Sequence, residues 1–149
     1  MGQYTRFGAM IATSTALMLG LMYLNTYAFD HIYWSETRAY MALVMGAAMA
    51  IVMLAFMQGM YEKTKANAAI FLSAVIVFAG SLYLVRSQET IDDVSWMKAM
   101  IPHHSIAILT SERANIADPR VRELADKIIE AQRQEIAQMK ALIADIEDR

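Results

Sequence analysis

The chain contains no cysteine among its 149 residues, so disulfides, thiolate zinc sites and cysteine nucleophiles are excluded. It also lacks a surplus of basic residues. The formal net charge is −2, which leaves no electrostatic footprint for nucleic acid. The sequence has no His-Glu-x-x-His, no glycine-rich phosphate loop, no nucleophile elbow and no Glu-x-x-His pair of the di-iron type. We therefore predict neither catalysis nor an organic cofactor.

Charged residues are scarce, at 19% of the chain, whereas 57% of the residues are hydrophobic. Ordinary soluble domains are about one quarter charged. The two kinds of residue are also segregated, because residues 7–85 hold most of the apolar residues and residues 86–149 hold most of the charge. This asymmetry predicts two domains, a membrane anchor at residues 1–86 and a small polar domain at residues 87–149.

Three segments of the anchor are long and apolar enough to cross a hydrocarbon core, which needs about 20 helical residues. These segments are Phe7–Phe29, Ala39–Tyr61 and Ala66–Val85. The first is too long for the apolar core of a signal peptide, which has about 7–15 residues, so we expect it to be retained. The lipid bilayer is therefore an expected partner.

Basic residues in the short loops indicate the orientation. With a cytoplasmic N-terminus, the inside would hold Arg6, Lys63 and Lys65, and the outside would hold Arg38 and Arg86. The margin of one charge favours a protein of the bacterial inner membrane with a periplasmic C-terminal domain. The loop between the first two spans would then share the outer side with that domain.

Two stripes recur every four residues within the spans. One consists of small residues, which let helices approach closely in lipid: Gly8, Ala12, Ala16 and Gly20, and then Ala42, Gly46 and Ala50. The other consists of Met41, Met45, Met49, Met53 and Met57. A conduit for Cu(I) is one interpretation of the methionines, but steps of about 40° spread them over half of the helix surface. We therefore interpret them as flexible packing side chains.

The polar half predicts two helices. Thr90 is a candidate N-cap for a helix that reaches about Ile116 and contains Pro102, which should kink it. Asp118 and Pro119 then supply a cap and a first-turn proline for a second helix that reaches nearly to the end. The predicted fold class is all-α, with three transmembrane helices followed by a long antiparallel αα-hairpin.

Residues 97–104 read Met-Lys-Ala-Met-Ile-Pro-His-His, and Met139 follows one helix later. Thioethers and imidazoles at this spacing are ligands for a soft metal, Cu(I) above all. His103 points about 100° away from His104 on a helix, so we expect it to face a partner chain or to meet His31.

The apolar seam of the second predicted helix is interrupted in its middle. The seam repeats in sevens and consists of Val121, Ala125, Ile128, Gln132, Glu135, Met139, Leu142 and Ile146. Antiparallel pairing about the turn places three pairs opposite each other: Met97 and Met139, Met100 and Glu135, and His104 and Gln132. A buried polar group without a partner costs on the order of 1–3 kcal/mol. The interruption therefore indicates either a metal site with hydrogen-bonded support or a polar layer that fixes the register.

These motifs closely resemble a bacterial domain-of-unknown-function family, family 305. The resemblance lies in Met-x-x-Met-Ile-Pro-His-His, Ala-Asp-Pro-x-Val-Arg-x-Leu-Ala and Ile-Ile-x-Ala-Gln-x-x-Glu-Ile-x-x-Met, within about Val94–Leu142. It implies a ferritin-like helical fold, of which the hairpin would be half, and some members of the family are periplasmic copper-binding proteins. It also implies the following metal ligands: Met97, Met100, His103, His104 and Met139.

Two functions are therefore expected from the sequence. The first is a membrane-anchored protein that binds Cu(I) or Ag(I) on the outer face for buffering, delivery or resistance. Its two polar helices imply a homodimer in which two hairpins complete a four-helix bundle. The alternative is a non-catalytic accessory subunit of a larger respiratory, photosynthetic or transport complex, which the small-residue faces and short loops of the anchor favour.

Overall fold

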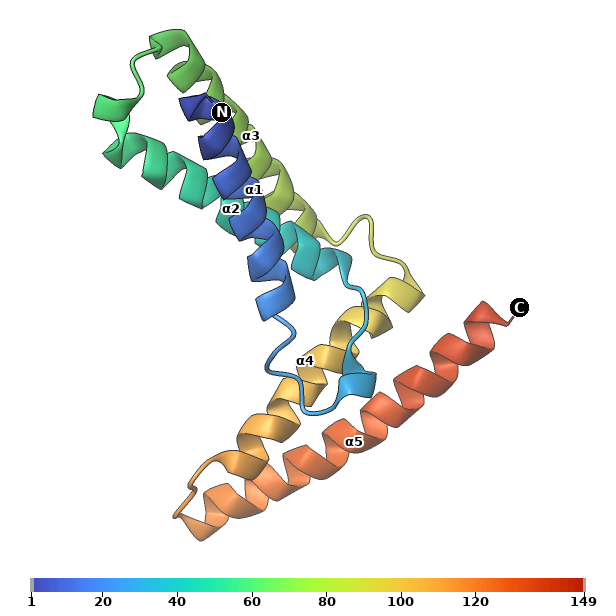
Figure 1. The fold of residues 1–149 in the computed structure, drawn as a ribbon. Coiled ribbons are helices and arrows are strands. Elements are labelled where there is room, and N and C mark those ends of the chain that lie inside the picture. Colours follow the sequence, from blue (N-terminus) through green and yellow to red (C-terminus); the bar gives the residue numbers. More distant parts are fainter. Residues whose placement is uncertain (1, 149) are drawn as a thin grey trace. The chain divides into compact units, whose positions relative to one another are not determined.

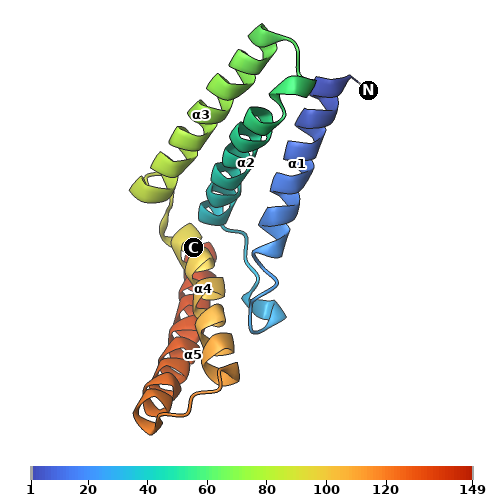
Figure 2. The ribbon, with the colours of Figure 1, turned by 90° about the vertical axis from the view of Figure 1, so that its left-hand side faces the viewer.

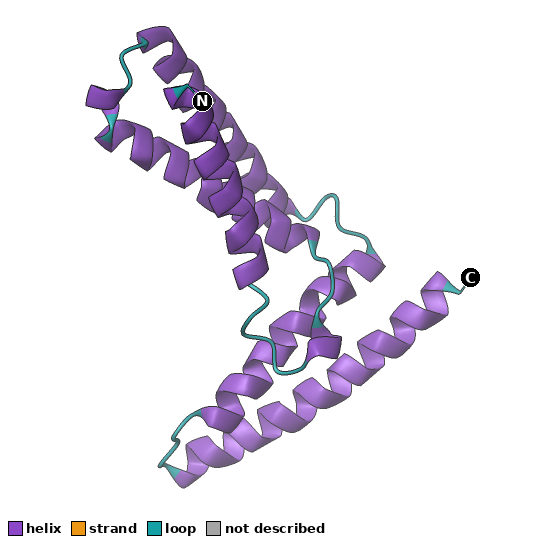
Figure 3. Cartoon of the chain, viewed as in Figure 1, coloured by secondary structure: helices purple, strands orange, loops and turns teal. Residues whose placement is uncertain are grey.

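The computed structural model describes residues 2–148, and all regular structure in that range is helical (Figures 1 and 3). The five α-helices are α1 (Gln3–Leu21), α2 (Glu36–Phe56), α3 (Thr64–Ser87), α4 (Asp93–Arg113) and α5 (Pro119–Glu147). Two short 3-10 helices, η1 (Phe29–His31) and η2 (Gln58–Met60), interrupt the connections on either side of α2. The predicted all-α class is confirmed.

The chain divides into two compact units. The first contains the residues up to Met22 together with Thr37–Thr90, which form α1, nearly all of α2, and α3. The second contains Tyr23–Glu36 and the chain from Ile91 onward, which form η1, α4 and α5. The connection between α1 and α2 thus belongs to the polar unit, although it lies in the segment that the sequence assigned to the anchor.

Two helices of the described chain, rather than the three that we predicted, are long and apolar enough to cross a membrane. They are α2 and α3. The first predicted span, Phe7–Phe29, is wrong because α1 already ends at Leu21 and the chain beyond Met22 folds with the polar unit. The helix that remains also carries Arg6 and three consecutive hydroxyl residues at positions 13–15, which lower its apolar character.

The first unit is held together where α1 begins. The buried cluster there consists of Phe7, Ala50, Leu54, Tyr61 and Ala74. The rings of Phe7 and Tyr61 meet edge to face with centroids 5.5 Å apart. The Tyr4 hydroxyl donates to Oδ1 of Asn67 at 2.9 Å and accepts from the backbone N–H of Lys63 at 3.1 Å. The start of α1 is therefore bound to the connection between α2 and α3 (Figure 2).

The small-residue stripe on α2 is buried, as the sequence predicts, and Gly46 shows why. A Cβ atom at Gly46 would lie 2.1 Å from Oγ1 of Thr15, so α1 and α2 touch at this point. The Thr15 hydroxyl donates to the Ile11 carbonyl at 2.8 Å, which holds its rotamer. A side chain larger than hydrogen at position 46 would therefore collide with α1.

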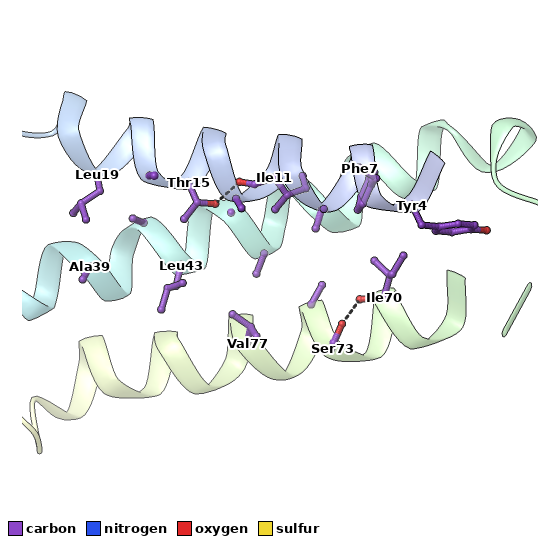
Figure 4. Close-up of a pocket in the computed structure, with 18 residues that line it drawn as sticks. Tyr4, Phe7, Ile11, Thr15, Leu19, Ala39, Leu43, Ile70, Ser73 and Val77 are labelled. Atoms are coloured by element: carbon purple, nitrogen blue, oxygen red, sulfur yellow. Dashed lines mark hydrogen bonds between the residues drawn. The ribbon is translucent and has the colours of Figure 1, made fainter. Parts of the chain in front are cut away.

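The stripe on α1 behaves differently, because its members are exposed rather than packed: Gly8, Ala12, Ala16 and Gly20. Three of these residues line a groove of about 680 Å³ that α1, α2 and α3 enclose together (Figure 4). Its walls are almost wholly apolar, with hydroxyl groups only at Tyr4, Thr15 and Ser73. The three helices of this unit therefore leave an open apolar surface among them.

In the second unit, α4 and α5 lie side by side (Figures 1 and 2). Their shared core consists of Met97, Ile101, Ile108, Ile136, Met139 and Ile143. Lys98 near the start of α4 pairs with Glu147 at the end of α5 at 2.5 Å, and Glu112 near the end of α4 pairs with Arg133 at 2.5 Å. These pairs show that the two helices run in opposite directions.

Side-chain caps set the beginnings of both helices. The Asp92 carboxylate accepts from the backbone N–H of Ser95 at 2.7 Å, so Asp92 rather than the predicted Thr90 is the N-cap of α4. The Thr90 hydroxyl instead lies 3.0 Å from that of Tyr40. The cap of α5 agrees with the prediction, because Asp118 accepts from the backbone N–H of Arg120 at 2.9 Å and Pro119 opens the helix.

Candidate metal centre

His104 of α4 lies between two hydrogen-bond acceptors. Its Nδ1 atom is 3.0 Å from the Met100 carbonyl oxygen, one turn earlier on the same helix. Its Nε2 atom is 2.7 Å from Oε2 of Glu135 on α5. The imidazole is largely covered, at 14% exposure, whereas the Glu135 side chain is 51% exposed. The exposed Glu135 carboxylate therefore contacts a largely covered ring.

This contact corrects the predicted register. His104 meets Glu135 rather than Gln132, whose amide instead donates to the same Glu135 oxygen at 3.3 Å. Side chains on a helix lean toward its N-terminus. In an antiparallel pair the two side chains therefore lean in opposite directions along the shared axis. As a result, His104 contacts a residue of α5 about one turn later in the sequence than the residue that lies directly opposite its Cα atom.

The hydrogen-bond geometry constrains the protons at this site. A backbone carbonyl only accepts, and so does an ionised carboxylate, whereas a neutral imidazole carries a single N–H. Both contacts of His104 are satisfied only when both ring nitrogens are protonated or when Glu135 carries the second proton. A metal ion that binds Nε2 must therefore displace a proton and move Glu135 aside.

Three methionines lie in the layer next to His104. Met97 and Met139 belong to the buried core, with 4% and 7% of their surface exposed, and Met100 is partly buried against the same cluster. The tertiary structure thus brings three thioether side chains from two helices into one cluster. On α4, His104 follows Met97 by seven residues and Met100 by four, so the three residues lie on the same face of the helix. This arrangement includes four of the five ligands that the resemblance implies.

His103, the fifth, is exposed and points away from this layer. Its ring centroid is 6.3 Å from that of His104, with a 64° angle between the planes. The expected contact with His31 is not found, because His31 Nδ1 lies 2.9 Å from the Ser105 hydroxyl. Of the two neighbouring histidines, only His104 faces the methionine cluster.

The connection between α1 and α2 packs on the other side of α4 through Ser105, which the sequence did not single out. The fully buried Ser105 hydroxyl accepts from the backbone N–H of Tyr27 at 2.6 Å and lies beside His31. Burial lowers the pKa of His31, and the nearby Asp30 only partly opposes this. A neutral His31 can accept the Ser105 proton at Nδ1. One buried serine therefore anchors the loop at two points.

A third anchor joins the same loop to α5. The Lys140 ammonium donates to Oδ2 of Asp30 at 2.5 Å, and this bond lowers the pKa of the Asp30 carboxyl. Tyr33 adds an apolar contact, since its ring packs against the core that α4 and α5 share. The loop therefore covers the side of the helix pair that carries Ser105 and Lys140.

The predicted seam of α5 is only partly correct. Ala125 and Met139 are buried, but five predicted members are exposed: Val121, Ile128, Glu135, Leu142 and Ile146. Ile136 and Ile143 take the buried places instead. Apolar residues on α5 form two adjacent stripes, and the helical periodicity of the sequence does not show which stripe faces α4.

The donor set restricts the metals that could bind here. Within residues 2–148, no three side chains from histidine, aspartate and glutamate gather as a metal site requires. A site at His104 would therefore depend on the sulfurs of Met97, Met100 and Met139. Thioethers suit soft ions such as Cu(I), and they do not suit Mg²⁺, Ca²⁺ or Mn²⁺.

The chain is similar to known proteins in its C-terminal half and beyond. Residues 82–147 match the model of the domain of unknown function DUF305. The chain is also 34% identical over 106 residues to the uncharacterized protein L153 of Acanthamoeba polyphaga mimivirus, covering 70% of this chain and 68% of that protein. An alignment of that length exceeds residues 82–147, so it extends into the apolar helices. No solved structure matches the chain.

Proposed function

The chain belongs to the DUF305 family, and the matched residues 82–147 include both α4 and α5. We propose that it is a membrane-anchored protein that binds Cu(I) or Ag(I). The observation that carries this proposal is the gathering of Met97, Met100 and Met139 in one cluster, with His104 on the same face of α4 as the first two. In this role the protein buffers or delivers the ion, or confers resistance to it. The α4–α5 pair serves as half of a ferritin-like four-helix bundle.

The chemistry of the residues supports a soft monovalent ion. Thioether sulfur and neutral imidazole nitrogen bind Cu(I) well, and they carry no charge that burial would penalise. Met100 and His104 lie nearer the surface than Met97 and Met139. The ion would therefore enter past Glu135 and meet His104 and Met100 first, and the two buried sulfurs would complete its coordination. Such a site suits exchange with a partner.

A competition titration tests the proposal directly. The full-length protein in detergent competes with a chromophoric Cu(I) chelator, beside the variant Met97→Leu/Met100→Leu/His104→Gln. Leucine has nearly the volume of methionine, so the core is retained. A control variant with Met41→Leu, Met45→Leu and Met49→Leu removes thioether sulfurs from α2 instead. Binding near one ion per chain or per dimer, lost only in the first variant, is expected. An unchanged chelator spectrum with the native protein would refute metal binding.

For the membrane, we propose that α2 and α3 cross the bacterial inner membrane and that α1, which is not apolar enough to cross by itself, passes between the same two ends in contact with them. Arg6, Lys63 and Lys65 all belong to the end where Tyr4 contacts the connection between α2 and α3. The excess of basic residues favours a cytoplasmic location for this end. The α4–α5 pair and the loop at Tyr23–Glu36 then lie in the periplasm.

The absence of native cysteine allows this orientation to be tested with single-cysteine variants. A membrane-impermeant maleimide applied to intact cells should label Ala117→Cys, between α4 and α5, but not Gln58→Cys in η2. After the cells are opened, both variants should react. Labelling of Gln58→Cys alone in intact cells would reverse the proposed orientation.

An accessory subunit of a larger membrane complex is the second candidate, and the apolar groove among α1, α2 and α3 favours it. A helix of another subunit could fill a groove of about 680 Å³ with apolar walls. Copurification of the native protein with a respiratory, photosynthetic or transport complex, without metal, would support this function over the first.

A further inference from the structure

One apolar stripe of α5 is covered by neither α4 nor the loop. Its members are Val121, Leu124, Ile128, Leu142 and Ile146, which are between 36% and 57% exposed. They recur at intervals of three, four and seven residues or their multiples, so they share one face of the helix. The half-exposed Glu135 interrupts the stripe near its middle. Apolar surface of this extent on a polar helix is typical of an interaction site.

The contacts of the second unit show which side of the helix pair the stripe occupies. Glu135 reaches His104, so the stripe and His104 lie on the same side. The loop packs on Ser105 and Lys140. At about 100° per residue, Ser105 is a quarter turn from His104, and Lys140 is about 140° from Glu135. The loop thus covers one side, and the side that carries the stripe is uncovered by it.

The same side continues onto α4. Trp96, eight residues before His104, lies about 80° from it, on the flank that points away from Ser105. Its indole is 52% exposed. The uncovered face therefore combines an aromatic side chain from α4 with the stripe from α5, and the His104–Glu135 pair lies between them.

We propose that this face binds the same face of a second copy of the chain, with the two α5 helices antiparallel and the two-fold axis near Glu135. In this arrangement Ile128 of one copy lies opposite Leu142 of the other, and Leu124 lies opposite Ile146. An isologous interface needs this kind of self-complementary surface. The two helix pairs then form a four-helix bundle.

Charges along the edge of the stripe select the second copy and its direction. The outer edge carries Arg120 and Lys127 in the first half of α5 and Asp145 in the second half, with uncharged Gln134 and Gln138 between them. Antiparallel pairing therefore places Lys127 of one copy near Asp145 of the other, at both ends of the interface. Both directions bring the two Glu135 side chains close together, but parallel pairing would also place Lys127 opposite Lys127 and Asp145 opposite Asp145, which is unfavourable.

The pairing has a consequence for the candidate metal centre. Because Glu135 lies near the two-fold axis, the partner's Glu135 and the partner's His104 come to the same layer. The second copy thus closes the exposed entrance to His104. The pairing itself depends on the stripe and its flanking charges, and it holds whether or not the site takes Cu(I).

Cysteine cross-linking tests the geometry, since the native chain has no cysteine. Full-length Ile128→Cys and Leu142→Cys chains with different tags are reconstituted together and oxidised. We expect a disulfide between the two different chains and little between identical ones. Glu130→Cys lies about 140° from Glu135 on α5 and serves as the control that should not cross-link. Preferential Ile128→Cys self-linking would establish a parallel pair and overturn the proposal, as would the absence of any cross-link.

The mass of the protein provides a second measurement. Ile128→Glu/Leu142→Glu changes only exposed positions, so the helix content should be unchanged while light scattering in detergent reports a monomer. Ala137→Glu, exposed on another face of α5, should remain dimeric. A stripe variant that stays dimeric, or a native chain that is monomeric, would refute the interface. The Cu(I) titration is independent of both results.

Discussion

His104 and Glu135 join α4 to α5 through a 2.7 Å contact at the edge of the apolar core that the two helices share. The other nitrogen of the same imidazole faces the Met100 carbonyl at 3.0 Å. Glu135 therefore lies on the side of Nε2 where a metal ion would bind. Glu135 is also half-exposed, so the pair lies at the edge of the core rather than inside it.

The first prediction concerns competition between metal and proton. Displacement of one proton by each ion makes the Cu(I) affinity fall by up to about tenfold per pH unit as the pH decreases. Glu135→Gln should reduce this slope, because a glutamine amide can donate to neutral His104. Competition titrations between about pH 6 and pH 8 measure it. Glu123→Gln, which only removes an exposed pair with Lys127, is the control. Equal slopes for Glu135→Gln and the native protein would contradict the assignment.

The second prediction concerns Ser105. Alanine at this fully buried position removes the hydroxyl that contacts the Tyr27 N–H and the Nδ1 atom of His31, which costs on the order of 1–3 kcal/mol. Amide hydrogen exchange at Tyr23–Glu36 should therefore become about 5–150 times faster. Ser111→Ala, a partly buried position later in α4, should leave this exchange unchanged. Unchanged protection in Ser105→Ala would show that the loop is held by other contacts.

The third prediction concerns pH. Burial lowers the pKa of His31 below its ordinary value of 6.5, so the unfolded chain takes up the proton first as the pH falls. The stability that neutral His31 contributes is fully present above pH 6.5 and is lost as the pH falls through the lowered pKa. The melting temperature of the polar unit should therefore fall as the pH decreases below about 6.5. His31→Gln should weaken this dependence, and His103→Gln, at an exposed position, should not.

The fourth prediction concerns the contact between α1 and α2. In Gly46→Ala the new Cβ would lie 2.1 Å from Oγ1 of Thr15, so the helices must separate or Thr15 must give up its bond to Ile11. Overpacking of this kind costs about 1–3 kcal/mol. Thermal unfolding in detergent should show the loss, and Thr15→Ala should partly restore stability. Gly20→Ala, with open space around it, should be harmless. Equal melting temperatures for the two glycine variants would exclude the close contact.

The difference between prediction and structure is clearest on α5. Its beginning could be predicted because Asp118 and Pro119 act on their own backbone neighbours. Its buried face could not, because residues such as Ile128 and Ile136 are equally apolar and lie on adjacent stripes. Which stripe faces α4 depends on packing with residues far away in the chain.

The candidate metal centre likewise has features that the sequence could predict and features that it could not. The motif at residues 97–104 and Met139 pointed to three methionines that the fold gathers in one cluster, whereas His103 is exposed. The direct contact of Glu135 with His104 was missed because helical side chains lean toward the N-terminus. No local pattern marked Ser105, since its role depends on a loop more than 70 residues away.

The sequence by itself determined the helical class, the separation of apolar and polar halves, and the cap at Asp118, because composition and neighbouring residues act over short distances. Only the tertiary structure decided where α1 ends, which unit holds the loop at Tyr23–Glu36, and which residue faces His104. These features arise from contacts between distant segments, and such contacts are formed by packing and side-chain direction rather than by local propensity.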